Sequence, residues 1–287
     1  MTITSPLYSF VQLSPLGATS PLEILPFADT ADIKFQFKLD VSTSTIADSI
    51  MAANFSLKIA NATGNITDGT TLTANTIHDY SSSSQYFTKF RLSPTSILFF
   101  WSYGIPSYSS FLSIGQCFKM AVIITSGSDT VIAISNVFKR TDDTVFTTVV
   151  TYSCNEDSYG FNYCVTGSTV PNSIRVSFYL QKIPQFQDDE SIYQKSNGSI
   201  QVLKSVTKKE YSCITDYLDT PTHEKLKIAL SSDSISLVSD TYNGGVVKNG
   251  AYEIAPLDIT GDIDIAQAKF KLYTTPYNVR NNNCGTC

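Results

Sequence analysis

Residues 173–180 read Ser-Ile-Arg-Val-Ser-Phe-Tyr-Leu, and residues 32–39 read Asp-Ile-Lys-Phe-Gln-Phe-Lys-Leu. Every second side chain in these stretches is apolar, which is the period-two pattern of a strand that buries one face. Comparable patterns recur at 55–59, 85–92, 117–125, 130–138, 144–152, 200–206, 210–217, 234–239, 250–255 and 268–274. The sequence therefore predicts a mainly β protein, a β-sandwich or β-barrel with one or two short helices and extended terminal arms.

The composition agrees with this fold class and limits the function. Charged residues make up 16% of the 287 residues, below the usual share of about 25%, and Ser and Thr supply much of the remaining polarity. The chain carries 20 Lys and Arg against 25 Asp and Glu, a formal charge of −5. This balance argues against a protein that grips nucleic-acid phosphates, because such binding needs a basic surface.

Two local signals fix individual elements. Asn197-Gly198 between two apolar runs predicts a tight hairpin. Thr220 is expected to cap a helix over 221–230, with Pro221 at its first position and an apolar stripe on its later turns. A second short helix is expected at 45–53.

Composition also suggests a division of the chain. The Pro-rich residues 1–28 are expected to form an extended arm. A polar, turn-rich stretch at 155–172 indicates a boundary near 170, between a β domain at 29–170 and a second one at 171–274 that contains the helix. Residues 275–287 are expected to be a tail that docks onto another surface.

The sequence shows no sign of membrane insertion or export. Residues 1–10 lack the basic start and apolar core of a secretory signal. The apolar run at 97–101 is far shorter than the roughly 20 residues that a spanning helix needs. We therefore expect a protein made in the cytoplasm, with no membrane partner.

A search for catalytic patterns returns little. His78 and His223 each adjoin an acid, but no third partner is indicated. The Gly-rich, nucleophile-elbow and phosphate-loop motifs are missing from the sequence. The acidic run 188–190 fits a solvated loop better than a cation site. Asp262 and Asp264 alternate along an expected strand edge and are candidate pore-lining residues. The sequence predicts no enzyme and no cofactor.

The last residues form the most unusual segment. Cys284 and Cys287 have the spacing of two metal ligands or a redox pair, yet a second pair of ligands is not evident, and free thiols remain open. Three asparagines precede them, whose side chains can satisfy backbone groups in a docked segment. The expected contact residues of this tail are Pro276, Val279, Arg280, Asn281, Asn282, Asn283, Cys284 and Cys287.

Several strings in the later part of the chain resemble one group of proteins. They are Tyr193-Gln-Lys-Ser-Asn-Gly198, the stretches 202–211, 223–230 and 268–273, Thr275-Pro-Tyr-Asn-Val-Arg-Asn-Asn-Asn-Cys284, and, less closely, Phe138-Lys-Arg with Tyr152 and Tyr159-Gly-Phe161. Together they resemble virion proteins of tailed phages of gut Bacteroidota, the crAss-like phages among them. The likeness covers about residues 115–287 and carries no catalytic residue.

The resemblance implies a structural role in the tail or neck of a virion. Such proteins form closed rings around the DNA channel, commonly sixfold or twelvefold, and many use a tail-tube-like β-sandwich or barrel with a flanking helix. The implied partners are further copies of the chain, neighbouring tail, portal or neck proteins, and DNA in transit, which an acidic wall would let pass.

Two other functions remain open at this point. The first is a fibre or baseplate adhesin that binds host glycans through Trp101, Tyr103, Tyr108 and the loop Tyr159-Gly-Phe161-Asn-Tyr163, since sugars stack on aromatic faces. The second is a glycan-cleaving enzyme with a pair of carboxylates, whose spacing in space the sequence does not reveal.

Overall fold

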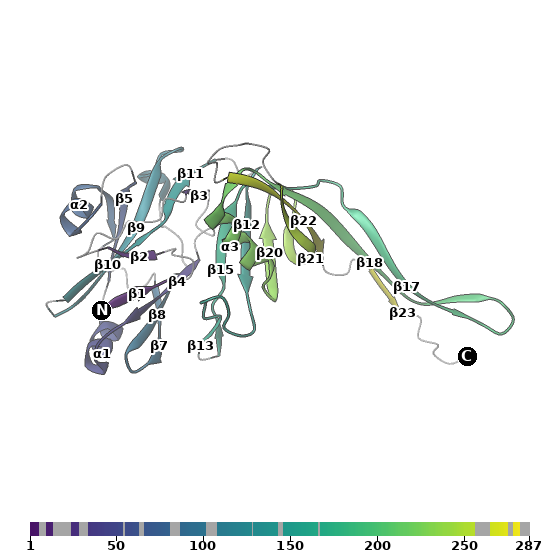
Figure 1. The fold of residues 1–287 in the computed structure, drawn as a ribbon, viewed down its shortest axis with the longest axis horizontal. Helices are drawn as coiled ribbons and strands as arrows, with labels where there is room; N and C mark the ends of the chain where they lie inside the picture. Colours follow the sequence, from purple (N-terminus) through teal and green to yellow (C-terminus); the bar gives the residue numbers. More distant parts are fainter. Residues whose placement is uncertain are drawn as a thin grey trace.

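The computed structural model describes residues 1–5, 10–13, 24–28, 34–53, 55–62, 66–80, 87–101, 108–127, 129–142, 146–165, 167–255, 265–274 and 278–281. They form a β-sandwich, a barrel-like sheet beside it, and a long hairpin that leaves the barrel and projects into solvent (Figure 1). The mainly β prediction is confirmed. Three short helices accompany the strands of the described residues, one more than expected.

The sandwich pairs two sheets. The first has the order β1 (Thr2–Thr4), β4 (Phe35–Asp40), β8 (Ser96–Trp101), β7 (Phe87–Ser93). The second has the order β2 (Phe10–Leu13), β10 (Asp129–Ser135), β9 (Cys117–Ser126), β11 (Val137–Arg140), β3 (Ile24–Phe27), with β5 (Ser56–Asn61) on β9 and β6 (Thr76–Tyr80) on β5. Helices α1 (Ser44–Ala52) and α2 (Gly69–Ala74) connect these strands; α1 is the helix expected at 45–53.

Aromatic side chains from both sheets fill the sandwich core. Phe37 and Phe99 stack with ring centroids 4.9 Å apart, and Phe55 meets Phe99 edge to face. Trp101 is fully buried against Phe87. The alternation read from residues 32–39 therefore does place one face of β4 in a core.

The N-terminal residues are not a free arm where the structure describes them. β1 pairs with β4, β2 with β10 and β3, in parallel, with β11. Phe27 is fully buried against Phe118. The prolines misled the sequence interpretation because they interrupt alternation, while short edge strands tolerate them.

The second unit is one sheet with the order β15 (Asn172–Val176), β12 (Thr148–Ser153), β20 (Ser234–Val238), β21 (Asn243–Ala255), β22 (Ile265–Thr274), β18 (Ile200–Thr215), β16 (Phe178–Leu180). Its first and last strands are parts of one segment, separated by Ser177 alone. The amide of Asp216 donates to the carbonyl of Ser177 at 2.9 Å. The sheet therefore closes on itself like a barrel, with segment 172–180 as the corner. Off this path lie β17 (Gln185–Gln194), β19 (Leu218–Asp219) and β23 (Asn278–Asn281), while β13 (Cys164–Val165) and β14 (Ser168–Thr169) pair separately.

Helix α3 (Thr220–Leu230) fills the barrel from one side. Leu226, Ala229 and Leu230 are buried in the same cluster as the inward strand residues. The expected helix is confirmed, but its cap is Asp219 rather than Thr220, because the Asp219 carboxylate accepts from the amide of Thr222 at 2.9 Å.

The two units are held together by polar and apolar contacts. The side-chain amide of Gln36 on β4 donates to the carbonyl of Asn162 at 3.0 Å and accepts from its amide at 2.8 Å. The amide of Ser173 donates to the carbonyl of Lys34 at 3.0 Å, and Leu25 of the sandwich packs in the barrel cluster. These contacts fix the barrel relative to the sandwich.

The division between the units differs from the expected one. β12 and β15 share a sheet, so that sheet runs across residue 170. Sheet membership changes between β11 and β12, that is, between residues 140 and 148. The stretch 155–172 is polar because it is a long connection within the barrel, and its aromatic residues Phe161 and Tyr163 are buried there.

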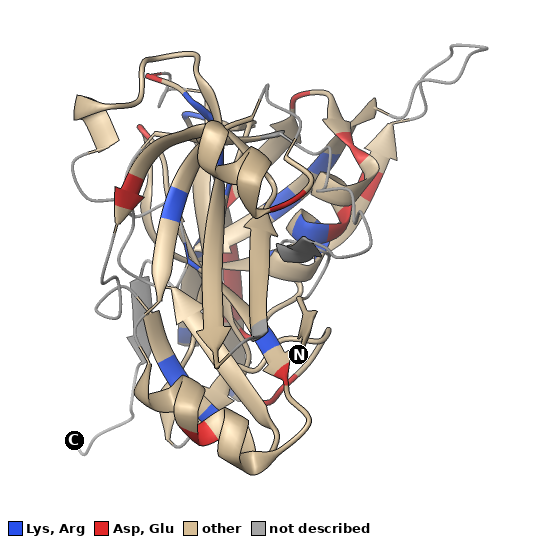
Figure 2. Cartoon of the chain, turned by 90° about the vertical axis from the view of Figure 1, so that its left-hand side faces the viewer, with Lys and Arg blue, Asp and Glu red and all other residues tan. Residues whose placement is uncertain are grey.

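Charge is sparse on the sandwich seen end-on, with single Lys, Arg, Asp and Glu residues interspersed among uncharged ones (Figure 2). This agrees with the low charged fraction of the sequence.

The capping contact predicts a measurable asymmetry at the start of α3. Asp219→Ala removes the side chain that accepts from the first turn and should lower the free energy of unfolding by about 1 kcal/mol. Thr220→Ala, one residue further on, should change it by less than about 0.5 kcal/mol. Denaturant unfolding of both variants measures this, and a larger loss for Thr220→Ala would contradict the assigned cap.

Candidate assembly interface

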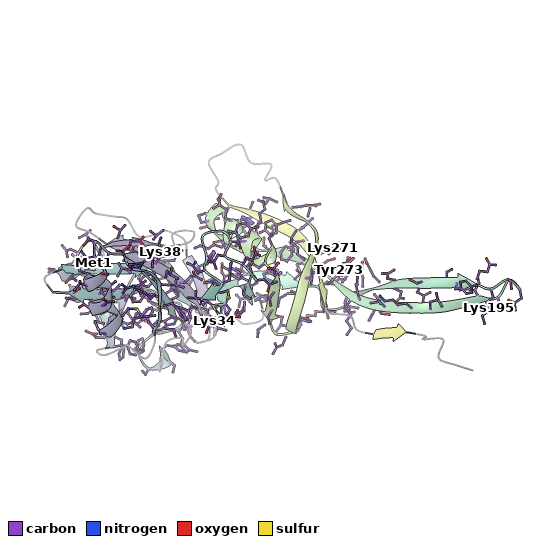
Figure 3. All side chains as sticks on the ribbon, turned by 90° about the horizontal axis from the view of Figure 1, so that it is seen from below. Met1, Lys34, Lys38, Lys195, Lys271 and Tyr273 are labelled. Carbon is purple, nitrogen blue, oxygen red and sulfur yellow. The ribbon has the colours of Figure 1, made fainter. Side chains whose placement is uncertain are left out.

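The hairpin of β17 and β18 is the feature of the fold that has no role in either core. Lys195 to Ser199 form its turn, with Gly198 at a φ of 82°, as the Asn197-Gly198 pair predicts. All ten residues of β17 are exposed. Figures 1 and 3 show the hairpin reaching far beyond the barrel, with Lys195 at its tip. We call residues 185–209 the arm.

One strand connects the arm to the barrel. β18 is 16 residues long, and the sequence had indicated two strands, at 200–206 and 210–217, in its place. Its first part pairs with β17 over residues 200–210, and its last part pairs with β16 and β22. The arm is thus a continuation of a barrel strand rather than a tethered loop.

The register of the arm determines which side chains share a face. Ser191 pairs with Lys204 and Ile192 with Val202, so Leu203 is an extra residue in a β-bulge. Paired residues share a face. One face therefore carries the side chains of Phe186, Asp188, Glu190, Ile192 and Gln194 from β17, and of Ile200, Val202, Ser205, Thr207 and Lys209 from β18. We call it the apolar-acidic face; its single basic residue, Lys209, lies at the base of the arm.

The apolar residues of this face are open to solvent. Ile192 is 62% exposed and Ile200 66% exposed, and Phe186 is also among the exposed large side chains. Between them, Asp188 accepts a hydrogen bond from the Thr207 hydroxyl at 2.6 Å. Exposed apolar side chains gathered on a projecting element are typical of a surface that contacts another molecule.

A buried carboxylate anchors the arm at its base. Glu210 is 1% exposed. It accepts from Lys271 Nζ at 2.8 Å, from Asn249 Nδ2 at 2.9 Å and from Gln187 Nε2 at 3.1 Å. The four residues come from β18, β22, β21 and β17, and Figure 3 places Lys271 where the arm leaves the barrel. The carboxylate therefore joins the arm to two barrel strands.

The electrostatics agree with an ionised pair at this anchor. The hydrogen bond from Lys271 holds the pKa of Glu210 below its ordinary value, and the same contact raises the pKa of Lys271. Burial opposes the first effect, but the donors outweigh it.

This anchor predicts an effect of removing the charge. Glu210→Gln should lower the free energy of unfolding by about 1–3 kcal/mol, because three donors lose a carboxylate acceptor in a buried position. Since the folded state lowers the pKa of Glu210, the stabilisation is complete above the ordinary value of 4.5 and is lost as the pH falls through the folded-state pKa. The difference between wild type and variant should shrink over that range.

The matched control is Glu190→Gln, the same substitution at an exposed position of the arm. It should leave stability within about 0.5 kcal/mol of wild type at every pH. Equal losses in the two variants, measured by denaturant unfolding, would contradict an anchoring role for Glu210.

The expected docking tail is described only in part. Val279, Arg280 and Asn281 lie in β23, which pairs with residues 204–207 of the chain's own β18. This strand extends the base of the arm to three strands, in the order β17-β18-β23. Pro276, Asn282, Asn283, Cys284 and Cys287 lie outside the described residues, as do Asp262 and Asp264.

Deleting residues 275–287 should therefore loosen the base of the arm. Hydrogen exchange of the peptide covering 204–207 should speed up about fivefold or more, as expected for the loss of about 1 kcal/mol or more per strand hydrogen bond. A peptide from β12 is the internal control and should not change. Unaltered exchange at 204–207 would show that β23 does not pair there in solution.

The two histidines that the sequence singled out have packing roles. His223 Nδ1 lies 2.7 Å from the Tyr252 hydroxyl and its Nε2 lies 2.9 Å from the carbonyl oxygen of Ala266. His78 stacks on Phe111 with centroids 4.3 Å apart. Burial raises the pKa of the Cys213 thiol to about 12, so this thiol is protonated at neutral pH. Cys154 and Cys164 are free thiols.

The aromatic residues considered for sugar binding do not form a platform where the structure describes them. Trp101, Phe161 and Tyr163 are buried. The Tyr108 hydroxyl donates to the carbonyl of Ala28 at 2.9 Å, and its ring packs on Phe27. Tyr159 is exposed, and Tyr103 lies outside the described residues. A single open ring does not provide the stacked surface of a glycan site.

Two properties of the described part of the chain concern metal binding and membrane insertion. It holds no cluster of three or more His, Cys, Asp and Glu side chains suited to a metal ion, and the run 188–190 lies exposed on the arm. None of its helices combines the length and apolarity needed to cross a bilayer.

A comparison of the chain with protein-family models and with curated proteins finds no match.

Sequence reasoning found the hairpin but missed the anchor. Nothing in the run Lys208-Lys209-Glu210-Tyr211 separates Glu210 from an ordinary exposed acid. Alternation places Tyr211 and Cys213 inward and therefore predicts Glu210 on the outer face of the strand, but it does not reveal the donors from three other strands that bury it there.

Proposed function

We propose that this chain is a structural protein of a bacteriophage virion and that it assembles with further copies into a closed ring in the tail or neck, around the DNA channel. The observation that carries the proposal is the arm. A projecting, anchored hairpin with exposed apolar side chains fits an assembling subunit better than a solitary protein.

The arm is compatible with ring-like association, in which the arm of each copy contacts a different surface on the next copy. Such head-to-tail contacts generate rings when the rotation closes. The contacts of Gln36 with Asn162 support this role, because a fixed angle between sandwich and barrel helps every copy repeat the same rotation.

The setting in a phage virion rests on the resemblance of the later part of the chain to virion proteins of crAss-like phages. With it come sixfold or twelvefold symmetry, a tail-tube-like use of the barrel, and neighbouring tail, portal or neck proteins as further partners. The net charge of −5 supports passage of DNA without retention. In this role the chain acts by assembly rather than by catalysis, and the buried aromatic residues favour it over the adhesin.

Disrupting the exposed face of the arm tests the proposal. The double variant Ile192→Asp and Ile200→Asp places two charges where we expect apolar contact and should abolish assembly, leaving a single 31.5-kDa chain. Light scattering and negative-stain imaging compare it with wild type.

The control is Val247→Asp, an equally exposed apolar position on the barrel strand β21. It should leave the rings intact. A wild-type protein that stays monomeric at all concentrations, or rings that survive the arm substitutions, would contradict the proposal.

A further inference from the structure

A long groove on the outside of the molecule offers a place for the arm of a second copy. It consists of two hollows that share Tyr179, one of about 450 Å³ at the junction of sandwich and barrel and one of about 670 Å³ on the barrel wall. We call the pair the Tyr179 groove.

The floor of the Tyr179 groove is apolar and open. The rings of Phe146 and Tyr179 lie 5.3 Å apart. Ile114 is 59% exposed and Phe146 49% exposed. On the barrel side, Tyr179 pairs with Ile214, and the row continues across neighbouring strands to Lys269 and Glu253.

We propose that the apolar-acidic face of the arm of one copy lies in the Tyr179 groove of the next copy. This inference rests on the proposed ring function and identifies the two surfaces that meet. The apolar residues of the arm, Ile192, Ile200 and Phe186, would cover the open rings of Phe146 and Tyr179 together with Ile114.

Charge would orient this pairing. The two hollows carry the acidic side chains Asp142, Asp216 and Glu253 as well as basic ones. Among the basic ones, Lys139 and Lys269 are exposed and form no ion pair with the described residues. Asp188 and Glu190 lie between the apolar residues of the arm face and likewise have no Lys or Arg partner there. Opposite charges at the rim of an apolar contact favour one orientation and exclude others.

The barrel part of the groove covers about half the length of β17. The ten residues of β17 span about 33 Å at about 3.3 Å per residue. Four neighbouring strands from β16 to β21 cross about 15 Å of barrel wall at about 4.8 Å per step, and the hollow at the junction of sandwich and barrel extends the groove further.

The groove is out of reach of the chain's own arm. β18 runs unbroken from Ile200 in the arm to Ile214 in the groove, and these 14 steps hold the two about 46 Å apart. Pairing of two arms side by side is also disfavoured, because the acidic run 188–190 of one arm would face the same run of the other. The arm of another copy meets both of these constraints.

A complementation experiment separates this inference from the proposed function. The arm variant, Ile192→Asp with Ile200→Asp, keeps its groove, and the groove variant, Phe146→Asp with Tyr179→Asp, keeps its arm. Each should be monomeric alone, with a melting temperature near that of wild type. Mixed in equal amounts, they should form a species of twice the 31.5-kDa chain mass and no larger one, because only one productive contact is available.

The other outcomes are distinct. If the groove variant alone still forms rings, or if the mixture stays monomeric, the groove does not receive the arm, although wild-type rings would leave the proposed function standing. If wild type itself never assembles, both proposals fail. Photocrosslinking from benzoylphenylalanine at Gln194, which pairs with Ile200 and so lies on the apolar-acidic face, checks the contact directly: we expect adducts with peptides that contain Phe146 or Tyr179 of a differently labelled copy. Adducts confined to the arm of that copy would overturn the inference.

Discussion

The continuity of β18 is the constraint on which the rest of the structure depends. A single strand of 16 residues belongs to the barrel at one end and to the arm at the other. Its barrel end is held by neighbours on both edges, β16 and β22, and Glu210 fixes the point at which the neighbours change. Without that strand the hairpin would be joined to the barrel only by flexible loops, and its direction would not be fixed.

The Glu210 anchor holds the arm through a hydrogen bond between two ionised groups, the Glu210 carboxylate and the Lys271 ammonium. A hydrogen bond between neutral groups in the same place would be weaker. A carboxylate that is 1% exposed loses hydration, and it persists only when donors replace the lost water. Three donors from three different strands do so. The result is a hydrogen-bonded polar cluster around Glu210 on the outer surface of the barrel. Tyr211 and Cys213, on the opposite face of β18, belong to the apolar core of the barrel.

Much of the fold followed from local sequence. Alternation predicted most strands, and Asn197-Gly198 predicted the hairpin turn because few residues accept the backbone angles of such a turn. The helix at α3 followed from Pro221 and its apolar stripe. These features are encoded within a few residues of where they occur, which is why one sequence suffices to find them.

The sequence does not reveal whether another part of the structure buries the apolar face of a strand. Ile192 and Ile200 alternate like core residues, and only the three-dimensional arrangement shows that no core lies beside them. The sequence did not predict β1 to β3 for two reasons. The prolines interrupt the alternation of this segment, and a pairing partner such as β10 lies more than 100 residues away. The Tyr179 groove likewise joins Ile114, Phe146 and Ile214, which no local pattern connects.

The alternation of side chains along the arm restricts how its length can vary between related proteins. Lengthening both strands by one residue between Glu210 and the tip would turn Ile192 and Ile200 to the opposite face, whereas lengthening them by two would restore the orientation. Arms in divergent chains should therefore differ in length by even steps, or carry a compensating bulge such as the one at Leu203. If the arm makes the proposed subunit contact, its length is constrained to even changes as well as its composition.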